Sequence, residues 1–325
     1  MSVSLKTQKM LWGRAAAMCA FPDCKRHLVE DETEVDDPAL VGENAHIVAR
    51  EDDGPRGDPD FPVDNRDRYE NLILLCAVHH TVIDKQPNHY TVEILRQMKA
   101  DHEQYVRDNL ATDPKKQRDD LIYAGYVDDW SKMANLDRWL IWSSHVMGHG
   151  QPTMSKELSE ELRELRRWLL TRVWPKRYPA LEAAFMNFFR VLQDFHETFL
   201  EHSEEIHGGE TLSTAKFYKI NYWDEEAYHR LLNQYEYHVD LVDDLMCELT
   251  RAANLVCDRI REILSSSFRL NEGHLLIQSG PHENLMFYEF VVQYSAEERV
   301  EDTPYPGLAK FKEDRAQRDR HYGSG

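Results

Sequence analysis

The sequence lacks long apolar segments. No run reaches the roughly 18 apolar residues that a membrane-spanning helix needs, and no apolar stretch near residue 1 suits a signal peptide. We therefore expect a soluble, cytoplasmic protein that is not exported and has no membrane partner.

Cysteine is also scarce, with five residues in a chain of 325. Cys247 and Cys257 lie ten residues apart in a helical pattern, so we interpret them as small buried side chains rather than as a disulfide. The odd number of cysteines favours a reducing, intracellular compartment. The other three, Cys19, Cys24 and Cys76, fall within the first quarter of the chain.

Positive charge is in short supply. Lysine and arginine number 39 against 58 aspartates and glutamates, which gives a formal net charge of −19. This balance argues against a protein that coats nucleic acid broadly and non-specifically through phosphate contacts. It does not exclude an enzyme that acts on a phosphodiester, because one bound divalent ion and a few local arginines can attract a phosphate.

Length and composition predict two domains. With 42% hydrophobic residues, the chain can bury a substantial core. The polar, proline-containing segment ATDPKKQRDD, residues 111–120, predicts a linker. It would separate an N-terminal domain of residues 1–110 from a mainly helical domain of residues 121–325.

The N-terminal third mixes helix and strand. The segments LVGENAHIVA and NLILLC are short and apolar, which predicts two strands. The segment between them is long and irregular, so we expect it to lie beside a functional site. An amphipathic helix is predicted at residues 88–110, and we expect its Arg96, Lys99 and His102 to be solvated.

Helical periodicity dominates the second half. Apolar residues recur every three or four positions in residues 155–174, 178–202 and 224–265. The first two stripes consist of Leu158, Leu162, Leu165, Leu169 and Val173, and of Phe185, Phe188, Leu192, Phe195 and Phe199. The third segment predicts a helix about 60 Å long. It forms either the spine of an intramolecular bundle or a coiled-coil seam between copies of the chain.

The rest of the second half carries weaker patterns. Residues 203–223 predict a loop that breaks at Gly208-Gly209. Residues 273–295 switch to β character and predict a hairpin around Ser279-Gly280-Pro281. The tail, residues 310–325, is charged and is expected to fray.

Four soft or borderline ligands occur in two pairs, Cys19-x4-Cys24 and Cys76-x2-His79. Proteins hold structural zinc with such ligand sets, taken from two short turns that a long excursion separates. The Cys76-x2-His79 spacing mirrors the usual Cys-x2-Cys turn. We therefore assign His79, rather than the adjacent His80, to a structural Zn²⁺.

A second set of residues is harder or ionisable and has no place in a zinc site: His46, Asn71, His80 and Asp84. His80 and Asp84 are four residues apart, so a helix would place both on one face. Imidazole and carboxylate together can hold a labile divalent ion.

This segment resembles the HNH endonucleases. His46 in AHI matches the histidine of the family's first strand, Asn71 in ENLILLC matches the asparagine, and His80 in HHTVID matches the metal ligand on the helix. The longer run AHIVAR…GPRGD…NLILLC…HHTVID is similar to the HNH nuclease effectors of bacterial antiphage systems. The resemblance implies an α+β fold, with a small zinc-stabilised ββα-metal HNH domain ahead of a mainly α-helical bundle that ends in a β-hairpin.

The resemblance also implies roles in phosphodiester hydrolysis. His46 would take the proton of the attacking water, and Asn71 would order the loop that carries His46. His80 and Asp84 would hold a catalytic Mg²⁺ or Mn²⁺. Many family members carry a metal ligand directly before the catalytic histidine, where this chain has Ala45.

The sequence leaves two assignments open: the other ligands of the ion and the residues that contact phosphate. Either His80 and Asp84 hold the ion alone, or Glu43 reaches it from a strand face that alternation places opposite His46. Arg50, Arg56 and Arg66 either contact substrate phosphates or form salt bridges with the abundant carboxylates.

The sequence thus predicts a metal-dependent DNA endonuclease that resembles an antiphage effector. Its helical part is expected to control the nuclease. That part is expected to drive homo-oligomerisation or to sense a partner protein or signal ligand. The alternatives are an HNH enzyme that cleaves RNA and a non-catalytic zinc module that binds a partner or nucleic acid.

Overall fold

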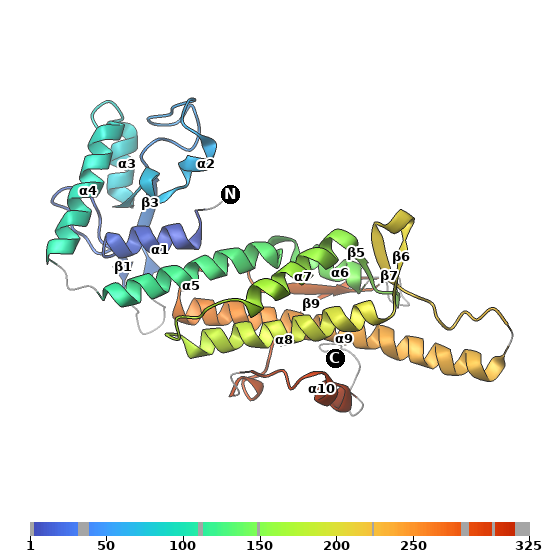
Figure 1. Cartoon of the computed structure of the whole chain (residues 1–325). Helices are drawn as coiled ribbons and strands as arrows, with labels where there is room; N and C mark the ends of the chain where they lie inside the picture. Colours follow the sequence, from blue (N-terminus) through green and yellow to red (C-terminus); the bar gives the residue numbers. More distant parts are fainter. Residues whose placement is uncertain are drawn as a thin grey trace. The chain divides into compact units, whose positions relative to one another are not determined.

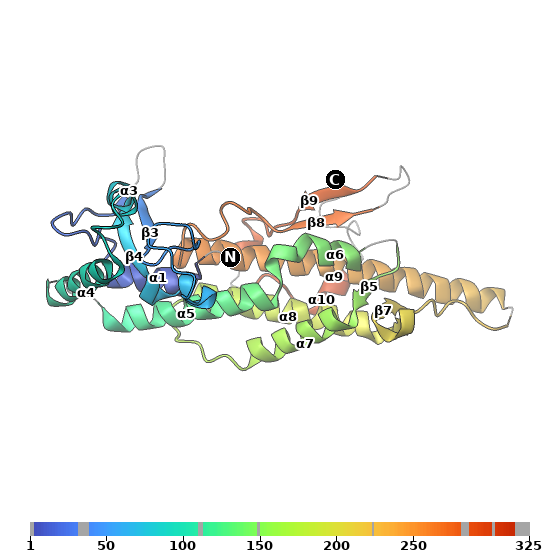
Figure 2. The same ribbon diagram turned by 90° about the horizontal axis from the view of Figure 1, so that it is seen from above.

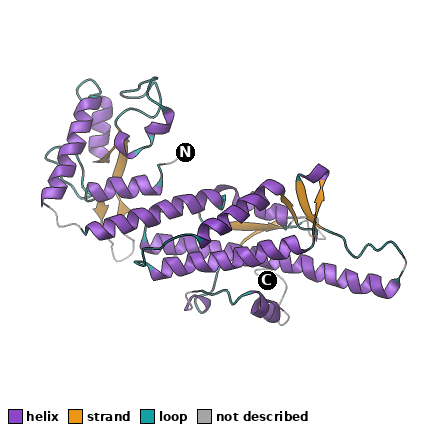
Figure 3. Cartoon of the chain, viewed as in Figure 1, coloured by secondary structure: helices purple, strands orange, loops and turns teal. Residues whose placement is uncertain are grey.

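The computed structural model describes residues 3–31, 39–109, 113–147, 150–222, 224–280, 286–300 and 303–315. By internal contacts the chain divides into two compact units, residues 1–128 and 129–325 (Figure 1). The first mixes helices with short strands, whereas the second is mainly helical and carries a β-hairpin near its end (Figure 3). The predicted α+β class and order of parts are confirmed.

The first unit contains the following described helices and strands: α1 (Leu5–Arg14), β1 (Val29–Glu30), β2 (Ala39–Leu40), β3 (Gly42–His46), α2 (Val63–Arg66), the 3₁₀ turn Tyr69–Asn71, β4 (Leu72–Cys76), α3 (Ala77–Lys85), α4 (Val92–Asn109) and the start of α5 (Pro114–Met133). β3 pairs with β4 in antiparallel register, with Gly42 opposite Cys76 and His46 opposite Leu72. α3 follows β4 without a loop, which completes a ββα core.

The core of the first unit forms around β4. All five residues of this strand are buried, because both of its faces are covered. Leu11 of α1, Leu28, Ile83 of α3 and Leu95 of α4 are buried in the same cluster. The sequence of this strand is continuously apolar because both of its faces are buried.

Two polar residues of α4 are buried, so their predicted solvation is wrong. The Lys99 side chain donates to the Tyr69 carbonyl and lies 3.5 Å from the centre of the Tyr69 ring; burial lowers its pKa to about 8. His102 Nε2 donates to the Ala15 carbonyl at 3.1 Å, and Lys25 Nζ donates to His102 Nδ1 at 2.9 Å. Both residues follow Leu95 and Met98 around the helix at three- and four-residue spacing, so they share the buried face.

The predicted linker is partly helical. Residues 114–120 belong to α5, and residues 111–112 lie outside the described part of the chain. Pro114 suits the first turn of a helix, and the polar residues after it are compatible with an exposed helix face. The division between the two units falls inside α5, between Asp128 and Asp129.

The second unit contains, within the described residues, the end of α5, the 3₁₀ turn Leu136–Arg138, α6 (Trp139–Val146), β5 (Thr153–Ser155), α7 (Lys156–Leu170), α8 (Pro179–Glu201), β6 (Ser203–Ile206), the 3₁₀ turn His207–Gly209, β7 (Thr211–Thr214), α9 (Glu225–Ile263), β8 (Leu276–Ser279), β9 (Tyr288–Val291), the 3₁₀ turn Glu298–Val300 and α10 (Leu308–Arg315). α8 and α9 lie side by side (Figures 1 and 2).

The three helices predicted from periodicity are present. Pro179 opens α8, and the aromatic stripe from Phe185 to Phe199 is buried. Trp130 packs edge-on against Phe185 and Phe188 at 5.4 and 5.5 Å between ring centres. Asp224 caps α9 by accepting a hydrogen bond from the Ala227 amide at 2.9 Å. The predicted 60 Å helix is thus packed within the unit for most of its length.

Two details of the second half differ from the sequence predictions. α7 ends at Leu170, before the turn that leads to Pro175, so Val173 leaves the predicted stripe and is 82% exposed. The predicted loop of residues 203–223 contains β6 and β7, which form a three-stranded sheet with β5. Each of these strands is too short for alternation to be visible in the sequence.

The predicted hairpin of β8 and β9 is present and antiparallel, with Leu276 opposite Val291. A polar side chain of α9 holds the chain on either side of it. Asn254 Nδ2 donates to the carbonyls of Leu275 and Val292 at 3.1 and 3.0 Å. These bonds fix the hairpin against the buried face of α9.

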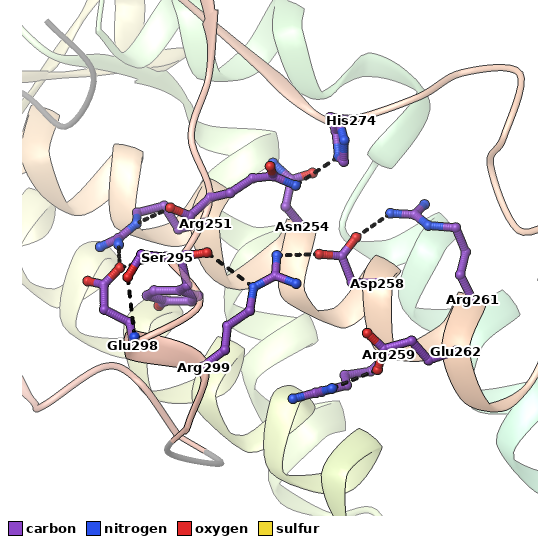
Figure 4. Close-up of polar contacts among 12 residues, drawn as sticks. Arg251, Asn254, Asp258, Arg259, Arg261, Glu262, His274, Ser295, Glu298 and Arg299 are labelled. Carbon is purple, nitrogen blue, oxygen red and sulfur yellow. Dashed lines mark hydrogen bonds and ion pairs between the residues drawn. The ribbon is translucent and has the colours of Figure 1, made fainter. Parts of the chain in front are cut away.

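Ion pairs tie the segment after the hairpin to the same helix (Figure 4). Arg251 pairs with Glu248 at 2.9 Å and with Glu298, and Arg299 reaches Asp258 at 2.5 Å. A hollow of about 470 Å³ lies beside Asp258 and Arg299. Asp258 pairs with Arg261 and Arg299 of this lining, and Glu262 pairs with the neighbouring Arg259, so the hollow has no surplus charge for an ionic ligand.

The charged tail is partly ordered, which corrects the expectation that it frays. Residues 308–315 form α10, where Phe311 is buried. Arg315 forms a buried ion pair with Asp244 of α9. A charged sequence can therefore end in a docked helix when its cation has a buried partner. Residues 316–325 lie outside the described part of the chain.

Among the described helices, none combines the length and apolar character needed to cross a lipid bilayer.

Replacing Arg251 with alanine should destabilise the second unit by about 3–5 kcal/mol, because it leaves Glu248 buried without its partner. Six of the seven tryptophans lie in this unit, so tryptophan fluorescence during urea unfolding reports its stability. The control Arg259→Ala removes a pair with the half-exposed Glu262 and should cost less than about 1 kcal/mol. Equal losses in the two variants would contradict the assignment.

Candidate functional site

The four predicted zinc ligands come together in the structure. One ligand atom from each of Cys19, Cys24, Cys76 and His79 lies within 4.8 Å of the other three. The Nδ1 atom of His79 is 3.6 Å from Cys19 Sγ and 3.2 Å from Cys76 Sγ. Three thiols and one imidazole at these distances are compatible with a tetrahedral Zn²⁺.

The backbone explains why the ligands converge. Cys76 is both the last residue of β4 and the N-cap of α3, so His79 lies in the first turn of the helix and turns back toward Cys76. On the other side, Asp23 has a φ of 61°, a conformation that aspartate tolerates, and this turn brings Cys24 beside Cys19. The Ala20 amide bonds to the Leu74 carbonyl at 2.9 Å, which joins this turn to β4.

Packing orients one ligand of this cluster, and burial controls the protonation of another. The Phe21 ring stacks on the His79 imidazole at 3.9 Å with an interplanar angle of 4°, which fixes the ring that carries Nδ1. Burial raises the pKa of the Cys19 thiol to about 12, so the metal-free site holds a protonated thiol. A zinc ion would displace this proton and stabilise the thiolate.

His46 lies at the end of β3 with 23% of its side chain exposed. Its Nε2 atom lies 2.9 Å from the Asp67 carboxylate. When Nε2 carries the proton and donates to Asp67, Nδ1 keeps a lone pair that can accept a proton from water. The His46 imidazole contacts Asp67 rather than His80 or Asp84.

Asn71 joins the two chain segments that carry His46 and Asp67. Its Nδ2 donates to the carbonyls of Val48 and Arg66, and its Oδ1 accepts from the Val48 amide, each at 2.9 Å. Asn71 is 3% exposed. It therefore holds the backbone on both sides of the candidate site and does not face solvent.

His80 lies between two carboxylates. Its Nδ1 contacts Glu43 of β3, and its Nε2 lies 3.3 Å from Asp84 of α3. Glu43 thus reaches the predicted metal ligand from the strand, although alternation places it opposite His46. His80 uses a different nitrogen for each carboxylate, so the three groups form a chain of contacts. A divalent ion would bind by replacing one of these two carboxylates as the partner of a His80 nitrogen.

Arg56 is buried, which does not fit the predicted phosphate contact. Only 4% of its side chain is exposed, and its guanidinium donates to Asp84 at 2.7 Å, to the Ile83 carbonyl at 2.7 Å and to the Ile47 carbonyl at 2.9 Å. Its donors are therefore used to tie the end of β3 to α3.

The long segment between β3 and β4 is held by a second buried arginine. Arg66 donates to Asp52 and to the carbonyls of Arg50, Asp58 and Phe61. Arg66 therefore also has a structural position. Arg50 differs from both, because 47% of its side chain is exposed and it lies 3.9 Å from Asp67.

Sequence reasoning missed Asp67 and Phe21. Asp67 is one of six aspartates between residues 51 and 70, and nothing in their spacing marks the one that contacts His46. Phe21 lies between the two cysteines of the first pair, which indicated only a turn. An aromatic residue inside a metal-binding turn could have indicated that it packs on a ligand.

Replacing Cys76 with serine should remove one equivalent of bound zinc per chain, because the remaining three ligands hold the ion less tightly. Inductively coupled plasma mass spectrometry of purified protein measures the loss. Cys257→Ala, which changes a buried cysteine of α9, is the matched control and should keep the zinc. Unchanged zinc content in Cys76→Ser would exclude the cluster as the site.

The comparisons with known proteins agree with this geometry over one segment. Residues 19–86 match a family described as HNH endonuclease. A search of curated proteins finds no relative of the chain. The matched residues run from the first zinc-ligand candidate to the end of α3 and include the ββα core. Residues 19–86 therefore form an HNH endonuclease domain whose Cys19, Cys24, Cys76 and His79 are compatible with a zinc knuckle.

Proposed function

We propose that the protein is a metal-dependent endonuclease that hydrolyses DNA phosphodiester bonds. The observation that carries this proposal is the position of His46 at the exposed end of β3, with Asp67 on one ring nitrogen. An HNH endonuclease domain is suited to nuclease activity in general. The residue roles are our inference from the site, and the choice of DNA rests on the family resemblance.

His46 acts as the general base. Nδ1 accepts the proton of a water molecule as that water attacks the phosphorus atom. The Asp67 carboxylate holds the ring in orientation through Nε2 and stabilises the imidazolium that forms. Asn71 keeps the end of β3 in place through its hydrogen bonds to Val48 and Arg66. For Arg50, which is half-exposed and lies 3.9 Å from Asp67, we propose a phosphate contact.

His80 and Asp84 are the residues that would hold the catalytic ion, with Glu43 as the alternative carboxylate on the other ring nitrogen of His80. Imidazole with a carboxylate suits Mn²⁺ or Mg²⁺, which keep water and phosphate oxygens as their other ligands. Bound there, the ion would polarise the phosphate and stabilise the leaving oxygen. Arg56 fixes the Asp84 carboxylate and the carbonyls beside it.

The net charge of −19 supports a small site rather than a broad one. A chain with this net charge repels a polyanion overall, so attraction must come from the ion and from local cations such as Arg50. We propose DNA as the substrate on the strength of the resemblance to DNA-cleaving antiphage effectors. RNA is tested in the same assay.

We further propose that the second unit controls the nuclease. It has its own core of aromatic residues and extensive helical surface, which suits self-association or the binding of a partner protein or signal ligand. Such control suits an effector that must stay inactive until infection. Native mass spectrometry of the full chain tests the expected homo-oligomer, and a monomer at micromolar concentration would contradict it.

Replacing His46 with alanine should lower the rate of plasmid nicking by about 100-fold or more in the presence of Mn²⁺, because the proton acceptor is removed. Supercoiled DNA and single-stranded RNA are incubated in parallel with each protein. His89→Ala, an exposed histidine in the same unit, is the control and should cleave like the wild type. Equal nicking by wild type and His46→Ala would exclude this role of His46.

Replacing Asp67 with asparagine should lower kcat by about 10- to 100-fold with little change in KM, because the base loses its orienting carboxylate. The matched control is Asp64→Asn in α2, a carboxylate in the same segment that has no part in the proposed site. Steady-state cleavage of a fluorescent oligonucleotide separates the two constants. A change confined to KM would instead assign Asp67 to substrate binding.

A further inference from the structure

A second group of potential metal ligands lies in the second unit, apart from the nuclease residues. It consists of Glu201, His202 and His238, and one ligand atom from each lies within 4.8 Å of the other two. Glu201 is the last residue of α8, His202 is its C-cap, and His238 lies on α9. The group therefore joins the end of one helix to the middle of its neighbour.

Packing holds both imidazoles in place. The His202 ring packs against Phe217 at 4.6 Å and meets the His238 ring at 4.8 Å with an interplanar angle of 88°. The His202 carbonyl accepts a hydrogen bond from the Ala215 amide at 2.7 Å, which fixes the backbone at this ligand. Rings held in this way lose little conformational freedom when they bind an ion.

The Nε2 atom of His238 lacks a hydrogen-bond partner among the described residues, although it is buried. His238 as a whole is 6% exposed. Buried ring nitrogens in folded proteins are nearly always hydrogen-bonded, because an unbonded polar group loses its interactions with water without gaining others. A cation coordinated through Nε2 would satisfy this atom.

The surrounding charges are compatible with a cation. The Glu201 carboxylate supplies negative charge, and the C-terminal end of α8 adds the negative end of the helix dipole. The positive charge of Lys312, on α10, has the opposite effect and disfavours further positive charge at His238. With one carboxylate among its ligands, the site can still bind a divalent ion.

We propose that Glu201, His202 and His238 bind a zinc ion. Two imidazoles and one carboxylate form a ligand set that zinc accepts, with water in the remaining position. The ion would cross-link α8 to α9 and stabilise the helical unit. This site is distinct from the cysteine cluster, and it does not depend on the proposed nuclease activity.

The test is a zinc titration of the purified full chain. Native mass spectrometry counts bound ions, and tryptophan fluorescence follows thermal unfolding of the second unit with and without Zn²⁺. We expect the wild type to bind one zinc more than His202→Ala, with at least a tenfold loss of affinity in the variant. Zinc should raise the Tm of the wild type and leave that of His202→Ala unchanged.

His229→Ala removes an exposed histidine from α9, the helix that carries His238, and is the matched control, which should bind zinc like the wild type. If His202→Ala loses helical content by circular dichroism, Glu201→Gln replaces it, because Glu201 is exposed at the helix end. Equal stoichiometry and equal Tm shifts in the wild type and both site variants would overturn the proposal. Absence of any zinc uptake beyond the cysteine cluster would do the same.

Discussion

The convergence of Cys19, Cys24, Cys76 and His79 is the constraint on which the candidate nuclease site depends. Cys76 ends β4 and caps α3, so a zinc ion bound there fixes the angle between the strand and the helix. His80 follows His79 directly, and its position beside Glu43 of β3 is set by the same turn. The strands of this core are only five residues long, so a bound metal ion would supply rigidity that such a small sheet lacks.

Two buried arginines also stabilise the N-terminal unit. Arg56 and Arg66 lie in the segment between β3 and β4, and both donate to backbone carbonyls as well as to a carboxylate. They order a segment that has few apolar residues of its own. Because these two cations are paired inside the protein, they do not offset the acidic charge of the chain toward a polyanion. The proposed use of a bound divalent ion is consistent with this distribution of charge.

Much of the fold could be predicted from the sequence because its signals are local. Ligand spacing indicated the cysteine cluster, and periodicity indicated α7, α8 and α9. The strands β5, β6 and β7 could not be found, because they have three or four residues and depend on one another for pairing. The burial of Lys99 and the docking of Arg315 depend on partners that lie far away in the sequence.

In the candidate site, too, only the local contacts could be predicted from the sequence. The cysteine cluster and the contact of His80 with Asp84 follow from spacing within a turn or a helix. The choice of Asp67 as the partner of His46 does not, because several aspartates of the same segment could reach it by sequence distance alone. The burial of Arg56 likewise follows from the path of the chain and not from its composition.

The most direct test of this account is a crystal structure of the chain with Mn²⁺ and a DNA duplex that carries a non-hydrolysable phosphorothioate. Anomalous scattering then locates each ion. The account predicts zinc among Cys19, Cys24, Cys76 and His79, manganese on His80, and the His46 imidazole facing the same phosphate as the manganese. Manganese bound elsewhere, or a His46 ring turned away from that phosphate, would contradict it.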